Sequence, residues 1–124
     1  MASIRAPRVL VAGALAAALL RSGAAEAHAI VVEATPAANQ SVTGSDVAIR
    51  LRFNSRIDHE RSRLTLLDSA GESRPLAIDA GGADEMLAGR ASGLAPGAYR
   101  LRWQVLAVDG HITRGELPFT VAHP

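Results

Sequence analysis

Cysteine and lysine are both absent from this chain of 124 residues, and aromatic residues make up only 3% of it. Without cysteine the chain has no thiolate ligands, so Cys-based zinc sites and blue-copper centres are excluded. Enzymes that cleave polysaccharides present a broad substrate surface. The chain has a single Trp and a single Tyr, which are too few to form such a surface. The long apolar run at residues 9–20 has 12 residues, whereas a helix that spans a bilayer needs about 20.

The N-terminal segment has the three regions of a secretory signal peptide, in the right order. Two arginines give a positive start, the apolar run follows, and a short polar region ends in Ala25-Glu26-Ala27. This small-x-small pattern is the type after which signal peptidase cuts. We therefore predict that residues 1–27 are a cleaved signal peptide and that His28 begins the mature protein. The alternatives are an uncleaved membrane anchor and a buried N-terminal helix.

Removal of this segment leaves residues 28–124, which are enough for one small domain with a core but too few for two. Three Arg and one Glu leave with the signal, so ten arginines face eleven acidic residues and the net charge is −1. That balance gives no basic surface for nucleic acid. We expect one exported domain with no nucleic-acid partner.

The apolar residues of the mature chain repeat with period two, which predicts β-strands with one buried and one wet face. The pattern is clearest at residues 47–53 and 99–107, where arginines occupy several of the alternate positions. Shorter strands are predicted at residues 29–34, 64–68, 73–78, 86–91 and 115–121. The fold expected is all-β, a seven-stranded antiparallel Greek-key sandwich of the immunoglobulin-like type, with a cupredoxin-like topology as the alternative. Tyr99, after a Pro-Gly turn, predicts a tyrosine corner.

Asp109-Gly110-His111 follows the strongest predicted strand. Asp-Gly is first of all a hairpin signal, so one interpretation is a tight turn with an exposed histidine. The alternative is a ligand pair, because residues two apart in extended chain point to the same side. Asp109 and His111 would then offer a carboxylate oxygen and an imidazole nitrogen to one point.

His28 adds further nitrogen ligands if it begins the mature chain. Its α-amine and ring Nδ1 can close a chelate on one metal ion, and imidazole nitrogen suits copper, nickel and zinc. Together with Asp109 and His111 these groups supply three nitrogens and one oxygen, a set that fits tetragonal Cu(II). By contrast, His59 sits in a charged stretch that we predict to be a solvated loop, outside any metal site.

Several motifs together resemble the CopC family of periplasmic copper-binding proteins over essentially the whole mature chain. They are His28-Ala29, Thr35-Pro36-Ala37, Leu51-Arg52-Phe53, the stretch from Gly97 to Trp103, Asp109-Gly110-His111 and the closing stretch from Gly115 to Phe119. The resemblance implies a periplasmic protein that is not an enzyme and acts in copper homeostasis. It also implies Cu(II) bound by His28, His111 and Asp109 or a nearby oxygen, and delivery to a CopD-type inner-membrane partner.

The chain departs from that family in three ways. Ala107 stands where many members have Ser before the Asp-Gly-His motif. Ser55 stands where many members have an acidic residue that interacts with the N-terminal amine. The mature chain also holds a single methionine, Met86, and one thioether cannot build a soft Cu(I) cage. We therefore expect a cupric site only.

Two other functions fit the same sequence. One is an immunoglobulin-like interaction module in which both histidines are incidental. The other is a copper redox enzyme, since oxidative polysaccharide-cleaving enzymes also use an N-terminal His. Those enzymes are much larger, and a carboxylate in the copper plane would fill the position that oxygen needs, so no polysaccharide substrate is expected.

Overall fold

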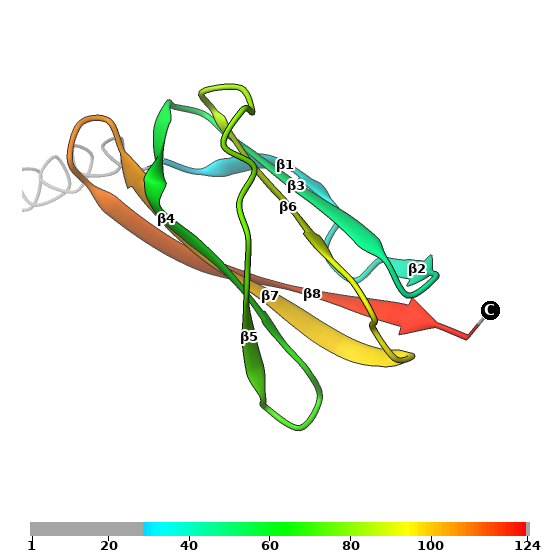
Figure 1. Cartoon of the computed structure of the whole chain (residues 1–124). Helices are drawn as coiled ribbons and strands as arrows, with labels where there is room; N and C mark the ends of the chain where they lie inside the picture. Colours follow the sequence, from blue (N-terminus) through cyan, green and yellow to red (C-terminus); the bar gives the residue numbers. More distant parts are fainter. Residues whose placement is uncertain (1–28, 124) are drawn as a thin grey trace, which may run out of the picture.

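The computed structural model describes residues 29–123, which form two β-sheets packed face to face. Eight strands follow one another along the chain: β1 (Val31–Thr35), β2 (Ser41–Thr43), β3 (Val47–Phe53), β4 (Ile57–Leu67), β5 (Ser73–Leu76), β6 (Met86–Ala91), β7 (Gly97–Ala107) and β8 (Ile112–Ala122). One sheet has the order β1-β3-β6 and the other the order β2-β8-β7-β4-β5 (Figure 1). This arrangement confirms the predicted all-β sandwich.

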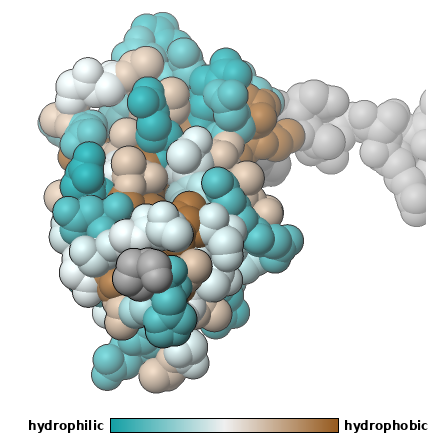
Figure 2. Space-filling model, turned by 90° about the vertical axis from the view of Figure 1, so that its right-hand side faces the viewer, coloured by the Kyte–Doolittle hydropathy of each residue, from teal (hydrophilic) through white to brown (hydrophobic). Residues whose placement is uncertain are grey.

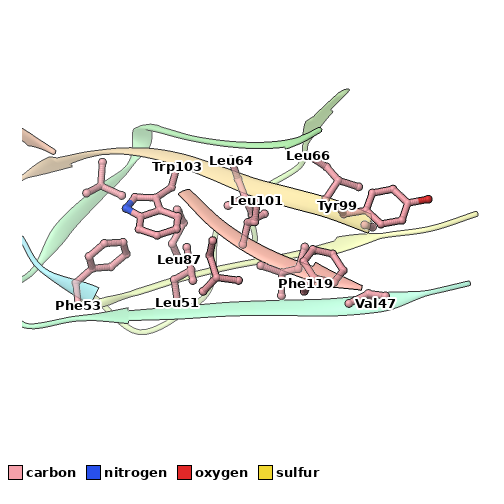
Figure 3. Close-up of a cluster of buried hydrophobic side chains, with 14 of the residues drawn as sticks. Val47, Leu51, Phe53, Leu64, Leu66, Leu87, Tyr99, Leu101, Trp103 and Phe119 are labelled. Carbon is pink, nitrogen blue, oxygen red and sulfur yellow. The ribbon is translucent and has the colours of Figure 1, made fainter. Parts of the chain in front are cut away.

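The period-two pattern forms the core as the sequence predicts. Every second residue of β3 is buried, and the residues between them are exposed. β7 buries its alternate residues from Tyr99 to Ala107 in the same way. Side chains from both sheets meet in one cluster between the layers (Figure 3). Because this burial drives folding, it also fixes which strand ends meet at each end of the sandwich.

The strand count is eight, one more than predicted, because β2 was not foreseen. β2 has only three residues, and it pairs with β8 in parallel, whereas the other described strand pairs are antiparallel. A strand of that length carries too little alternation to be detected. Within residues 29–123 there is no helix long and apolar enough to cross a membrane.

The predicted tyrosine corner is present. The Tyr99 hydroxyl donates a hydrogen bond of 2.7 Å to the Ala95 carbonyl oxygen, four residues earlier. The Tyr99 ring stacks on Phe119, with 5.7 Å between the ring centroids. Figure 3 shows the hydroxyl pointing away from the cluster of buried side chains. The ring therefore packs with the core while its polar end holds the loop before β7.

Trp103 and Gly115 face each other across β7 and β8. Trp103 is only 9% exposed and belongs to the core, as predicted. A Cβ placed on Gly115 would lie 2.6 Å from Cε2 of the Trp103 indole, so the ring occupies the space that a side chain would need. Glycine at this position lets the largest side chain of the core lie flat on β8.

Arginines on the outer faces of both sheets pair with acidic neighbours. Arg52 contacts Glu33 at 3.2 Å, and Arg102 contacts Glu116 at 2.6 Å. The hydrogen bond from Arg102 holds the pKa of Glu116 below its usual value. These groups are solvent-exposed, and such pairs contribute little to stability.

Candidate metal site

The β7–β8 hairpin carries Asp109 and His111 at one end of the sandwich (Figure 1). The strands pair up to Leu106 and Ile112, and the Ala107 N–H closes the turn with a 2.8 Å hydrogen bond to the His111 carbonyl oxygen. Gly110 has φ of +94°, which L side chains rarely adopt. The Asp-Gly hairpin prediction is therefore confirmed, and the glycine is required by the turn.

Asp109 and His111 contact each other directly. Oδ1 of Asp109 accepts a 3.1 Å hydrogen bond from the His111 backbone N–H and lies 3.2 Å from His111 Nδ1. Both side chains are half exposed, at 51% each. The two side chains meet because an Asx turn folds the aspartate back onto the residue two positions on. The expectation that they share one side is met, but through a turn and not through extended chain.

The electrostatics of the pair keep the aspartate ionised. The hydrogen bonds from the His111 backbone and ring hold the pKa of Asp109 below its usual value. A carboxylate in this state can bind a cation or orient an imidazole that does so. The pair thus offers one hard oxygen and ring nitrogen at an exposed turn.

The start of the described chain reaches the same end of the sandwich. Ala29 is 1% exposed and belongs to the core. Ile30 exchanges two hydrogen bonds with Asn54, one to the side-chain Oδ1 at 2.8 Å and one from the Asn54 backbone N–H at 2.9 Å. Figure 1 shows the beginning of β1 and the β7–β8 hairpin at one end. Sequence reasoning missed this contact, and the available signal was only the tendency of Asn to bond to backbone groups.

His28, the third predicted ligand, lies outside the described residues. Within residues 29–123 there is no group of three or more His, Cys, Asp or Glu side chains that could hold a metal ion. Asp109 and His111 are therefore a pair of donors in the described part of the chain. A complete site would need ligands from elsewhere.

Large exposed apolar side chains lie next to this pair in the hairpin and at the start of the domain. Ile30 and Val32 lie at the start of the domain, and Val108 and Ile112 flank the turn, with exposed fractions between 48% and 67%. The opposite end of the sandwich, which Figure 2 faces, is mostly hydrophilic, with hydrophobic surface in small areas between polar side chains. The two ends of the molecule thus differ in polarity.

His59 lies in β4 and is partly buried, so the prediction that it belongs to a solvated loop was wrong. Its Nε2 is 2.7 Å from the Met86 carbonyl oxygen. The β4 strand is irregular between Asp58 and Arg63, where the Asp58 carboxylate accepts a hydrogen bond from the Arg61 N–H. This local turn of polar residues inside a strand hides the period-two signal. His59 serves the packing of β4 against β6.

A protein-family model for the CopC domain matches residues 31–122. The chain belongs to the CopC family. The Escherichia coli K12 protein YobA is 32% identical over 98 residues, which are 77% of this chain and 79% of YobA.

Solved structures of the family have the same fold as this CopC domain. CopC from Methylosinus trichosporium OB3b is 33% identical, with a TM-score of 0.69, over 77% of this chain and 95% of that one. PcoC, a methionine-rich copper resistance protein from Escherichia coli, is 24% identical, with a TM-score of 0.63, over 77% of this chain and 99% of PcoC. This CopC chain differs from PcoC in methionine content, since it has only two methionines.

Proposed function

We propose that this CopC chain is an exported, periplasmic protein that binds one Cu(II) ion and carries or buffers it. The proposed ligands are the α-amine and Nδ1 of His28, the imidazole of His111 and the carboxylate of Asp109. The observation that carries the proposal is the Asp109–His111 pair, held at the end of the sandwich where residue 29 enters the core. A mature chain that begins at His28 would start one residue before Ala29, at that end of the sandwich, because consecutive residues are only about 3.8 Å apart.

The donor chemistry supports copper in its oxidised form. Nitrogen and carboxylate donors suit Cu(II), whereas Cu(I) prefers thiolate and thioether sulfur. The chain has no cysteine, and after signal cleavage its single methionine is Met86. Asp109 has its carboxylate ionised and its Oδ1 already directed at His111. It can thus act as a ligand or orient the ring of His111.

The family supports a role in copper homeostasis for a protein that is not an enzyme. PcoC is a copper resistance protein by its name, and we infer the same general role here. Delivery of copper to a CopD-type inner-membrane partner is part of the proposal. The exposed apolar side chains that flank the pair are consistent with a partner that approaches the bound ion.

Copper titration of the processed protein tests the function. The protein is exported in a bacterial host, its N-terminus is verified by mass, and Cu(II) is added against a competing chelator. We expect one equivalent to bind tightly and His111→Ala to abolish tight binding. His123→Ala is the matched control, since His123 is exposed near the other end of the chain. Equal binding by all three proteins would favour the interaction module with incidental histidines.

A further inference from the structure

Residues 54–56, which join β3 to β4, contact Ile30 and Val108, which lie close along the chain to the two parts of the proposed copper site. Asn54 bonds to Ile30 through its side-chain Oδ1 and its backbone N–H, at 2.8 and 2.9 Å. Two residues later, the Arg56 carbonyl oxygen accepts a 3.1 Å hydrogen bond from the Val108 N–H, next to Asp109. One three-residue segment thus holds the start of the domain on one side and the hairpin on the other.

This segment is itself fixed at both flanks. The Phe53 N–H donates to the Glu85 carbonyl oxygen at 2.8 Å, and the Ile57 N–H donates to the Asp84 carbonyl oxygen at 2.9 Å. The side chains of Phe53 and Ile57 are 2% and 4% exposed and belong to the core. Residues 54–56 therefore form a short bridge between two anchored strand ends.

The backbone N–H of Ile30 bonds to Asn54 because Ile30 lies before the first strand. β1 begins at Val31, whose partner in β3 is Phe53. The Ile30 N–H is donated to the Asn54 side chain and not to a strand carbonyl. The Asn54 carboxamide thus extends the pairing by one residue beyond the end of the sheet, toward position 28.

We propose that Asn54 is a positioning residue for copper. By holding Ile30, it sets where the amine and ring of His28 lie relative to Asp109 and His111. The inference rests on the proposed function, since it assigns to Asn54 a share of that site's affinity. Ligands must be held within about 0.5 Å of their productive places. A free chain end would otherwise lose backbone freedom when copper binds, which weakens binding.

Variants of Asn54 separate positioning from general stability. Asn54→Ala removes the acceptor of the Ile30 N–H, whereas Asn54→Asp keeps an acceptor of the same shape. Gln40→Ala is the matched control, because Gln40 Oε1 accepts a 2.8 Å hydrogen bond from the Ala37 N–H just before β2, away from the hairpin. Each processed protein is titrated with Cu(II) in one buffer, and Ile30 amide exchange is measured in the copper-free protein.

We expect Asn54→Ala to bind Cu(II) about 3- to 10-fold more weakly, the range of one hydrogen bond's net contribution. Asn54→Asp and Gln40→Ala should bind within about twofold of the wild type. Ile30 amide exchange should accelerate in Asn54→Ala alone. The electron paramagnetic resonance spectrum of the Cu(II) complex should show weakened nitrogen coordination in Asn54→Ala and a normal spectrum in Asn54→Asp.

Equal affinity of Asn54→Ala and wild type would overturn the positioning role and leave the proposed function intact. An equal loss in Gln40→Ala, or no rescue by Asn54→Asp, would also overturn it, because the effect would then be general. If Asn54→Ala fails to fold, Asn54→Ser takes its place, and the same affinities decide. A wild type that takes up no copper overturns the proposed function itself.

Discussion

The opposition of Gly115 and Trp103 gives a stability prediction that can be worked out from the structure. Replacing Gly115 by Ala would place a methyl group 2.6 Å from Cε2 and 3.0 Å from Nε1 of the indole. Non-bonded carbons prefer about 3.5–4.0 Å. The indole or the β8 backbone must therefore move, and Trp103 has little room because it is only 9% exposed in the core.

The expected cost follows from two opposing effects. Overpacking of a core costs about 1–3 kcal/mol. Replacing glycine by alanine returns about 0.4–1 kcal/mol, because the unfolded chain loses freedom. The net loss for Gly115→Ala is thus about 1–2 kcal/mol. For a domain of this size that corresponds to a fall in Tm of roughly 4–16 °C.

Urea and thermal unfolding followed by tryptophan fluorescence measure this loss, since Trp103 is the only tryptophan in the chain. Gly81→Ala is the control, because an added Cβ there has no neighbour within 4 Å and the backbone does not have positive φ. The control should be as stable as the wild type or slightly more stable. If Gly115→Ala matches the control, the indole does not depend on a glycine at this position and the packing argument is wrong.

Further predictions concern the site and the tyrosine corner. Asp109→Asn should weaken Cu(II) binding by about 10- to 100-fold. The Tm should change little, because the side chain is at the surface. Isothermal titration measures the affinity, and an unchanged value would remove Asp109 from the site. Cu(II) affinity should fall as the pH drops from about 8 to 5, because an α-amine with a pKa of about 7.7–8.0 takes up a proton. The lowered pKa of Asp109 keeps its carboxylate ionised over this range. A flat profile would argue against an amine ligand. A Cu(I) chelator should strip cuprous ion from the processed protein readily, and retention against it would contradict a purely cupric site. Tyr99→Phe should lower the free energy of unfolding by about 1 kcal/mol through loss of the 2.7 Å bond to Ala95, and an unchanged urea midpoint would show that the corner adds no stability.

The strands that the sequence predicted best are those whose period-two pattern is unbroken. β3 and β6 have the predicted bounds, and β7 begins only two residues early, at Gly97. β4 begins at Ile57, seven residues before the predicted start at residue 64. Its first half is a polar stretch around an irregularity, where Asp58 bonds to the Arg61 N–H, so no alternation was visible.

The candidate site was predictable in part. The spacing predicted that Asp109 and His111 face one side, although the turn that brings them together is local and differs from the extended chain assumed. Asn54 could not be singled out, because its partner Ile30 is 24 residues away and the contact depends on how β1 ends against β3. Whether His28 completes the site stays a prediction.

The central claim is that the α-amine of His28 is a copper ligand. The most direct measurement compares the mature protein beginning at His28 with an otherwise identical protein beginning Gly-His, titrated with Cu(II) in the same buffer. The added glycine should weaken binding severely, leave the copper-free Tm unchanged, and reduce the copper-induced stabilisation, which is about 4 kcal/mol at 1,000 times Kd. Equal affinities for the two proteins would contradict the claim, because the displaced amine would then have no part in binding.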